Sequence, residues 1–371
     1  YCRLHNQFTS LTFAPHGPLA LYKAGHKLNR EDYVRAADLY MLYLLAATRD
    51  PFGDKLDSYS EEWVQALERK GSRYVLNSRS ILGVSFQYGM ALDALCRGFM
   101  ATHPNEVSFN SKAAALYDWL QHFRTNRGPY FKLGYGGREV EGQQVDGATS
   151  DDLGLVGRGL ASYYTVSRRK EVLDDLVGLA GYFLRAHRYN SDDGCFSEEV
   201  GSWVIGPWPL KGAGEHMLAR ERRDKQSWGY SVREAVDFLT RLYGWIEDEQ
   251  IRKLICDRTT RGMKWVFDKC QFEDGAIGMF QRDDAFTGMA AAGILDFLDC
   301  RNAGFLNDNE GAEYGRKAQR AMDWILSWSP DALIKEAGHK YVNGGVTLFP
   351  PENLAWMLAW TVEALLRIEE L

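Results

Sequence analysis

Two adjacent carboxylates, Asp151 and Asp152, stand where a glycine-broken acidic loop turns into a helical pattern, in the stretch QQVDGATSDDLGLVGRGLASYY. Carboxylates whose pKa lies near neutral pH can act as general acids or bases. At the first turn of a helix, negative charge is also favoured by the helix dipole and the free N–H groups. Which of these two roles the pair takes depends on the elements built around it.

A second acidic pair, Asp283–Asp284, has the same form, and the remaining candidates lie in long loops. Such loops mix acids with aromatic and other polar side chains. This mixture suits a carbohydrate site, because carboxylates bind hydroxyls and transfer protons while rings can stack on sugars. The candidate catalytic residues are Asp152, Asp151, Asp283, Asp284 and Glu198. The candidate substrate-binding residues are Trp203, Trp208, Trp228, Arg138, Asp146, His216, His339, Tyr341 and Asn343.

Two kinds of helical segment alternate along the chain. One kind is amphipathic with a recurring aromatic, and it occurs around Tyr43, Trp119, Tyr182, Trp265 and Trp324. The other kind is rich in small and apolar residues on most of its faces. It occupies roughly 10–24, 80–100, 152–167, 230–245, 284–301 and 352–370. A helix that is apolar on most faces should be buried on most faces. We therefore expect an all-α (α/α)6 toroid, a six-hairpin barrel with six inner and five outer helices, formed by residues 1–371 as a single domain.

The connections between the two kinds of helix are unequal in length. Inner-to-outer turns are short, whereas the outer-to-inner loops are long and cover 52–79, 124–151, 188–229, 271–283 and 329–351. Since the chain reverses direction at each helix, the long loops should all lie on one face, where function is expected. We favour Asp152 over Asp151 as the catalytic acid, because we take the helix side of Leu155, Val156 and Gly159 to face the axis.

The segment SDDLGLVGRGLASYYTVSRRKEVLDDLVGLAGYFLRAHRYNSDDGCFSEE resembles the six-hairpin glycosidase-like toroid proteins, and among them the unsaturated glucuronyl and rhamnogalacturonyl hydrolases. In those enzymes a catalytic aspartate opens an inner helix, and a hairpin and an aspartate-glycine turn follow. The resemblance implies that Asp151 or Asp152 is the catalytic residue. The segment differs from those hydrolases at Ser150, where they usually have a tryptophan.

These observations favour a glycoside hydrolase that acts on an oligosaccharide, with an acidic one as the preferred substrate, by carboxylate acid–base catalysis. A polysaccharide lyase on the same toroid is an alternative, in which His339, Tyr341, Asn343 and Arg138 would supply the base and neutralise a uronate. A sugar epimerase would instead need two histidines facing each other in the cavity. A non-catalytic glycan-binding or scaffold protein would keep the tryptophans and lack a close pair of carboxylates.

Composition excludes several other classes. The net charge of -6 and the lack of a basic cluster argue against nucleic acid as the partner. No apolar run reaches the length needed to span a membrane. The six cysteines form no C-x-x-C pair, and H-E-x-x-H, G-x-S-x-G and nucleotide-loop motifs are missing, so we expect neither a metal nor a cofactor. The sequence starts at Tyr1, which leaves a signal peptide, the location and the oligomeric state open.

Overall fold

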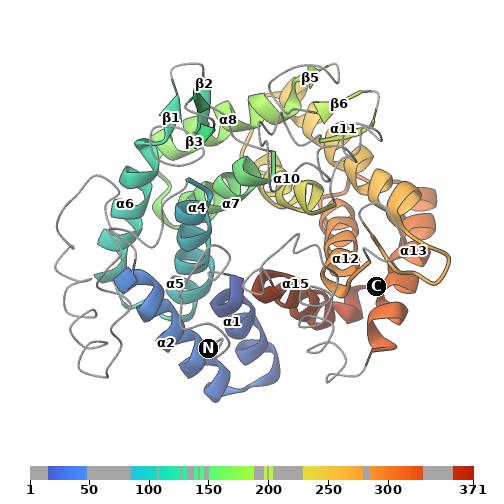
Figure 1. The fold of residues 1–371 in the computed structure, drawn as a ribbon, viewed down its shortest axis with the longest axis horizontal. Coiled ribbons are helices and arrows are strands. Elements are labelled where there is room, and N and C mark those ends of the chain that lie inside the picture. Colours follow the sequence, from blue (N-terminus) through green and yellow to red (C-terminus); the bar gives the residue numbers. More distant parts are fainter. Residues whose placement is uncertain are drawn as a thin grey trace.

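The computed structural model describes residues 16–47, 85–106, 108–125, 128–131, 138–140, 143–145, 150–187, 196–198, 200–203, 229–278, 285–328 and 354–371. Helices dominate this part of the chain. They form two concentric rings, and the colours of Figure 1 follow the chain once around them.

The inner ring contains the six segments that are apolar on most faces. In chain order they are α1 (His16–Leu28), α4 (Ser85–Asp93), α7 (Ser150–Ser167), α10 (Gly229–Tyr243), α12 (Thr287–Asn302) and α15 (Leu354–Leu366). The first turns of α4 lead into the π-helical segment η1 (Ala94–Phe99) and the short α5 (Met100–Thr102). From α4 to α15 each inner helix packs against the next, α1 packs against η1 at the end of α4, and α15 packs against α1, so that the ring is closed (Figure 1).

The outer ring contains the amphipathic segments. These are α2 (Glu31–Ala47), α6 (Ser108–Gln121), α8 (Lys170–Leu184), α11 (Glu249–Trp265), which continues into the π-helical η2 (Val266–Cys270), and α13 (Asp308–Leu326). A 3-10 turn, η5 (Ile368–Glu370), follows α15. The prediction of an (α/α)6 toroid with six inner and five outer helices is confirmed, including the placement of each segment in its ring.

Strands are few and short in the described residues. They pair as β1 (Arg124–Thr125) with β2 (Gly128–Phe131), as β3 (Arg138–Val140) with β4 (Gln143–Val145), and as a three-stranded group of β5 (Ala186–His187), β6 (Phe196–Ser197) and β7 (Ser202–Trp203). All seven lie in connections from an outer helix to the next inner helix. The inner helices therefore begin on the face that receives the long connections, as the sequence predicts.

Local sequence signals set the short turns on the opposite face. Asn29 and Gly304 take positive φ values of 52° and 74° between an inner helix and its outer partner, a conformation that asparagine and glycine accept most easily. Asp248 caps α11 by accepting hydrogen bonds from the backbone N–H groups of the second and third residues that follow it. Asn307 and Glu310 form a capping box at the start of α13. These signals fix where each hairpin reverses.

Glycines allow the inner helices to approach closely. A Cβ on Gly159 of α7 would lie 2.2 Å from the carbonyl oxygen of Gly89 on α4. On the other side of α7, a Cβ on Gly157 would lie 2.7 Å from the ring of Phe238 on α10. Side chains at these positions would push neighbouring helices apart, so the low helix propensity of glycine is offset by closer packing.

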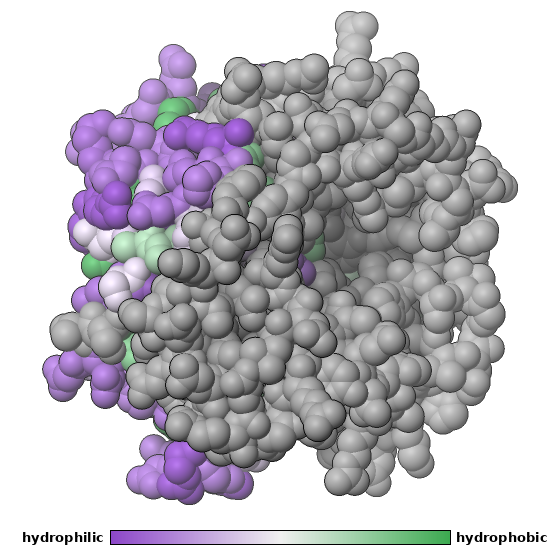
Figure 2. All heavy atoms as spheres, turned by 60° about the vertical axis from the view of Figure 1, so that its left-hand side comes forward, coloured by the Kyte–Doolittle hydropathy of each residue, from purple (hydrophilic) through white to green (hydrophobic). Residues whose placement is uncertain are grey.

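On the face drawn in Figure 2, the surface of the described residues is mostly hydrophilic, with isolated apolar side chains. Leu39 on α2 and Leu254 on α11 are among the exposed ones, at 64% and 38%. Scattered residues of this kind are normal on a folded protein and form no docking surface. Among the described helices none is both long and apolar enough to cross a membrane.

Candidate active site at the axis of the inner ring

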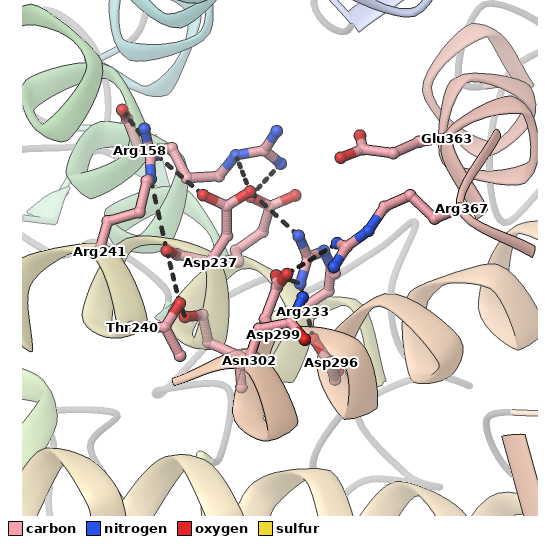
Figure 3. Close-up of polar contacts among 12 residues, drawn as sticks. Arg158, Arg233, Asp237, Thr240, Arg241, Asp296, Asp299, Asn302, Glu363 and Arg367 are labelled. Atoms are coloured by element: carbon pink, nitrogen blue, oxygen red, sulfur yellow. Dashed lines mark hydrogen bonds and ion pairs between the residues drawn. The ribbon is translucent and has the colours of Figure 1, made fainter. Parts of the chain in front are cut away.

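Charged side chains meet where the inner helices face one another. We call this group the axial cluster, and much of it is drawn in Figure 3. Its described members are Lys23 of α1, Asp93 of α4, Arg97 of η1, Arg158 of α7, Arg233, Glu234, Asp237 and Arg241 of α10, Asp296 and Asp299 of α12, Glu363 of α15 and Arg367 just after it. These members are six acidic and six basic residues, so their formal charges balance.

Arg158 lies at the centre of one half of the axial cluster. Its Nη1 donates a hydrogen bond of 2.7 Å to Glu234, and its Nη2 donates one of 3.2 Å to Asp93. Its Nε lies 3.4 Å from Oδ2 of Asp237. One guanidinium therefore serves three carboxylates from two other helices, and its own side chain is only 2% exposed.

The carboxyl of Glu234 keeps its proton to unusually high pH. Burial raises its pKa from an ordinary 4.5 to about 7, although Arg158 acts in the opposite direction. Asp93 behaves differently: burial opposes its ionisation, but Arg97 and Arg158 outweigh burial and lower its pKa to about 2. Two carboxylates that touch the same guanidinium thus differ widely in pKa, a pattern that accompanies acid–base roles in enzymes.

Arg233 organises the second half of the axial cluster. Its Nη1 donates to Asp296 at 3.0 Å and to Asp299 at 2.7 Å, and Nη2 donates to Asp237 at 3.1 Å. Arg367 reaches Asp299 from the end of α15 at 2.8 Å (Figure 3). Burial raises the pKa of Asp296 well above its ordinary value, against the effect of Arg233. The network joins α10, α12 and α15 through side chains alone.

Apolar side chains stand beside these charges. Phe86 and Met90 of α4 and Leu155 of α7 form a small buried cluster separate from the main core. His16, at the start of α1, packs edge-on against Trp360 of α15 with ring centroids 6.1 Å apart. Burial and the charge of Arg158 lower the pKa of His16, so the imidazole is neutral at neutral pH. These apolar and aromatic residues belong to the same inner helices as the axial cluster.

Asp151 and Asp152 occupy the first turn of α7, on the face where the inner helices begin. The position of Glu234 relative to this turn follows from Gly154, because a Cβ on Gly154 would lie 2.5 Å from the Cβ of Glu234. Gly154 follows Asp151 by three residues, a little less than one turn. The backbone of the acidic pair thus stands about one turn, or ~5 Å of rise, from Glu234.

Two of the three residues behind the preference for Asp152 over Asp151 face a neighbouring helix. Val156 and Gly159 face α4, since a Cβ on Gly89 would lie 2.7 Å from the Cα of Val156, and Gly159 abuts the Gly89 backbone. The residue of α7 that reaches the axial cluster is Arg158. Asp151 precedes Arg158 by seven residues, close to two full turns, so their Cα atoms lie on the same side of α7.

The prediction that Glu198 is catalytic is not supported. Its carboxylate pairs with Arg258 and Arg261 of the outer helix α11. Burial opposes ionisation, but the two arginines outweigh it and lower the pKa of Glu198. The side chain is 48% exposed. An exposed, doubly paired carboxylate next to the outer ring is suited to fastening β6 to α11 and is poorly suited to proton transfer.

The prediction that Trp203 stacks on a sugar is wrong, because its side chain is fully buried. Its Nε1 donates a hydrogen bond of 3.0 Å to the carbonyl of Phe183 at the end of α8. Its ring packs edge-on against Phe196 and fills the space beside Gly262 of α11. Trp203 therefore anchors β7 between two outer helices.

The other candidates lie largely outside the described residues. Arg138 is described only in its backbone, as part of β3. Asp146, Trp208, His216, Trp228, Asp283, Asp284, His339, Tyr341 and Asn343 fall outside the described ranges. Within those ranges no three His, Cys, Asp or Glu side chains are grouped so as to hold a metal ion.

Sequence reasoning missed Glu234 and Arg158, although a signal was present. Otherwise apolar inner helices carry ionisable residues at a spacing of four, as in Arg233 and Asp237, or Glu363 and Arg367. Charges at that spacing lie on one side of a helix. On a helix predicted to be buried on most faces, such charges indicate one side that faces other charged side chains and does not pack in the hydrophobic core.

Comparisons with known proteins identify the fold. A polysaccharide lyase matches with a TM-score of 0.60 and 16% identity over 96% of this chain and 91% of the lyase. A sugar epimerase from a ruminal bacterium matches with a TM-score of 0.61 and 10% identity over 94% of this chain and 86% of the epimerase. Other matches include a protein from Salmonella enterica described as a possible member of glycoside hydrolase family 105, and a family 88 glycosyl hydrolase from Bacteroides vulgatus.

A third similar structure is an inactive variant of an α-1,6-mannanase of glycoside hydrolase family 76 from Salegentibacter, in complex with α-1,6-mannotriose. It matches with a TM-score of 0.52 and 10% identity over 95% of this chain and 89% of the mannanase. Two consecutive aspartates of that enzyme are replaced by asparagine. No family model and no curated protein matches the sequence. The chain therefore shares the toroid fold of the glycosidase-like proteins that it resembles in sequence pattern.

Proposed function

We propose that the protein is a carbohydrate-active enzyme, a glycoside hydrolase that cleaves an oligosaccharide by carboxylate acid–base catalysis where the inner helices begin. The observation that carries this proposal is the placement of Glu234. Its buried carboxyl has a pKa of about 7, and its Cβ lies beside Gly154, which follows Asp151 on α7 by a little less than one turn. A proton-bearing carboxyl next to a second acid is the minimum equipment for glycoside cleavage.

In this proposal Glu234 is the general acid, and it protonates the leaving oxygen of the glycosidic bond. Asp151 is the ionised partner, which activates water as a base or attacks the sugar as a nucleophile, depending on the separation of the carboxyls. Asp151 is preferred to Asp152 because the helix places it on the side of Arg158. No metal or cofactor has a step in this chemistry.

The structural neighbours support the reaction class, though each resembles this chain only in fold. They include a lyase, an epimerase and hydrolases that all act on carbohydrates by name. The mannanase is inactive when two consecutive aspartates are replaced. An acidic pair is present here at the start of an inner helix. A polar, aromatic-walled site with a titrating acid fits that chemistry better than it fits a scaffold.

The experiment is a turnover screen on neutral and uronate-containing oligosaccharides with three variants. Asp151→Asn and Glu234→Gln should each lower turnover by about 100- to 10,000-fold, the usual contribution of a general acid or base. Asp152→Asn should cost much less. Asp175→Asn is the matched control, since Asp175 is an equally buried acid held by Tyr117 and Arg124 on the outer ring.

The screen separates the proposal from its alternatives. If the product absorbs in the ultraviolet as an unsaturated sugar does, the protein is a lyase and the hydrolase proposal fails. Retention of a glycan without any turnover would identify a binding protein. If Asp152→Asn is the inactive variant while Asp151→Asn is active, the residue assignment is wrong although the reaction class stands. The uronate arm decides whether the predicted preference for acidic sugars holds.

A further inference from the structure

We infer that Asp93 is a positioning residue for Glu234, because it holds the guanidinium of Arg158 from the α4 side and leaves Glu234 a single hydrogen bond from it. This inference rests on the proposed role of Glu234 as the general acid. The three residues come from three different inner helices: Arg158 of α7 contacts both Asp93 of α4 and Glu234 of α10.

The geometry around Asp93 is fixed from three sides. Ser162 of α7 donates a hydrogen bond of 2.5 Å to Oδ1. Arg97 donates one of 2.7 Å to Oδ2, one turn further along the same helix. Arg158 donates to Oδ2 at 3.2 Å. Because Ser162 and Arg97 hold the carboxylate of Asp93 independently of Arg158, Asp93 can in turn fix the plane of the Arg158 guanidinium.

That plane decides what Arg158 offers to Glu234. A guanidinium that pairs with one carboxylate alone commonly binds it through two parallel hydrogen bonds. Here Nη2 is committed to Asp93 and Nε is directed towards Asp237, so only Nη1 reaches Glu234, at 2.7 Å. Within the described residues this is the one side-chain hydrogen bond that Glu234 accepts.

The consequence for Glu234 is incomplete compensation of its burial. A carboxylate that received both Nη groups of Arg158 would be stabilised in its charged form. Sharing the guanidinium with Asp93 withholds part of that stabilisation, which agrees with a pKa of about 7 for a carboxyl in an ion pair. Asp93 thereby keeps the proposed acid protonated at neutral pH without touching the substrate.

Other titratable and charged groups also face this part of the axis. They are Arg233, Asp237 and Arg241 on α10 itself, Arg97 of η1, Asp296 and Asp299 of α12, Glu363 of α15, and Lys23 and His16 of α1. Of these, Asp237 raises the pKa of Glu234 and Arg233 lowers it. Among them Asp93 and Asp237 contact Arg158, and Asp93 is the one that accepts a hydrogen bond from it.

The test measures the pKa of Glu234 by carbon-13 NMR of its carboxyl in the enzyme without substrate, with Glu234→Gln to assign the signal. Asp93→Asn removes the charge that competes for Arg158 and keeps the size of the side chain. We expect the pKa of Glu234 to fall by about one unit or more. In the active enzyme the basic limb of the kcat/KM profile should move to lower pH by the same amount.

Asp299→Asn is the matched control, because Asp299 belongs to the axial cluster but pairs with Arg233 and Arg367 and not with Arg158. It should shift the pKa of Glu234 by much less. Equal shifts in the two variants would mean that the pKa of Glu234 responds to the loss of any nearby negative charge and not to the sharing of the Arg158 guanidinium. That result would overturn the inference. An unchanged pKa in Asp93→Asn would overturn it as well.

Arg97→Gln keeps the inference testable if Asp93→Asn does not fold. Without Arg97, the carboxylate of Asp93 draws more strongly on Arg158, so the pKa of Glu234 should rise. A fall or no change contradicts the inference. The NMR readout does not require activity: a shifted pKa in a protein without turnover would uphold the role of Asp93 and reject the proposed function alone.

Discussion

At the scale of the residue, the carboxyl of Glu234 links chemistry to stability. Burial raises its pKa from 4.5 to about 7, so between these values the folded protein binds a proton that the unfolded chain releases. The stability that comes from this proton is fully present below pH 4.5 and is lost as the pH rises through 7. At higher pH Glu234 is ionised in the folded protein, and the burial of this charge lowers stability.

Glu234→Gln should therefore stabilise the protein in a pH-dependent manner. The amide cannot ionise, so the gain over the wild type should appear above neutral pH and approach about 3 kcal/mol once the window is crossed. Thermal unfolding at about pH 5 and about pH 8 measures it. Glu171→Gln, at the exposed start of α8, is the control and should show no gain at high pH. A variant less stable than the wild type at both values would contradict the assigned pKa.

The residue scale is also where sequence reasoning reached least far. Asp151 and Asp152 were found because a helix start is readable from composition, and the backbone of both lies in that first turn. The prediction for Trp203 was wrong because a Gly- and Pro-rich loop has no regular periodicity that separates buried from exposed rings. Glu234 was missed because its raised pKa comes from burial, which is only partly offset by Arg158, 76 positions away in sequence. A pKa set by tertiary contacts has no local signature.

At the scale of the element, the crossing of α4 and α7 depends on two glycines. Gly89 and Gly159 face each other with no space for a side chain between the backbones. The sequence predicted this use of inner-ring glycines, because they lower helix propensity in segments that nevertheless fold as helices. It could not predict which glycine meets which helix.

Gly159→Ala should destabilise the protein by about 1–3 kcal/mol or more, the usual cost of overpacking, because the new Cβ would lie 2.2 Å from a carbonyl oxygen. Gly181→Ala is the matched control on the outer helix α8, where nothing lies within 4 Å of the new Cβ. That change should stabilise by about 0.5–1 kcal/mol through helix propensity. Chemical denaturation measures both, and the same sign for the two variants would be inconsistent with the close approach.

At the scale of the whole molecule, the ring depends on the joint between its first and last inner helices. Lys23 of α1 pairs with Glu363 of α15 at 2.5 Å, and the Glu363 side chain is only 12% exposed. Burial opposes the ionisation of Glu363, but Lys23 and the nearby arginines outweigh it and lower its pKa. The ring order itself was predictable, since alternation of two helix types and of short and long connections leaves few arrangements.

Glu363→Gln should loosen this joint before it affects the rest of the ring. Removing one partner leaves Lys23 with an uncompensated charge, which is unfavourable for a partly buried pair. Hydrogen exchange monitored by mass spectrometry should accelerate in α1 and α15 more than in α7 and α10. Glu369→Gln breaks the exposed Lys27–Glu369 pair and should leave exchange unchanged. Uniform acceleration around the ring would argue against a local joint.

The joint between α1 and α15 also bears on the order of events during synthesis. Every other neighbouring pair of inner helices is separated in sequence by one outer helix and its connections, whereas these two lie at opposite ends of the described sequence. Lys23 is synthesised 340 positions before its partner Glu363. A ribosome therefore releases an arc of hairpins whose two edges are unpaired, and the arc becomes a circle only after α15 has emerged. Until then the apolar edges of α1 and α12 are available to chaperones or to the wrong neighbour, so the docking of the inner helix α15 is the closing step of folding.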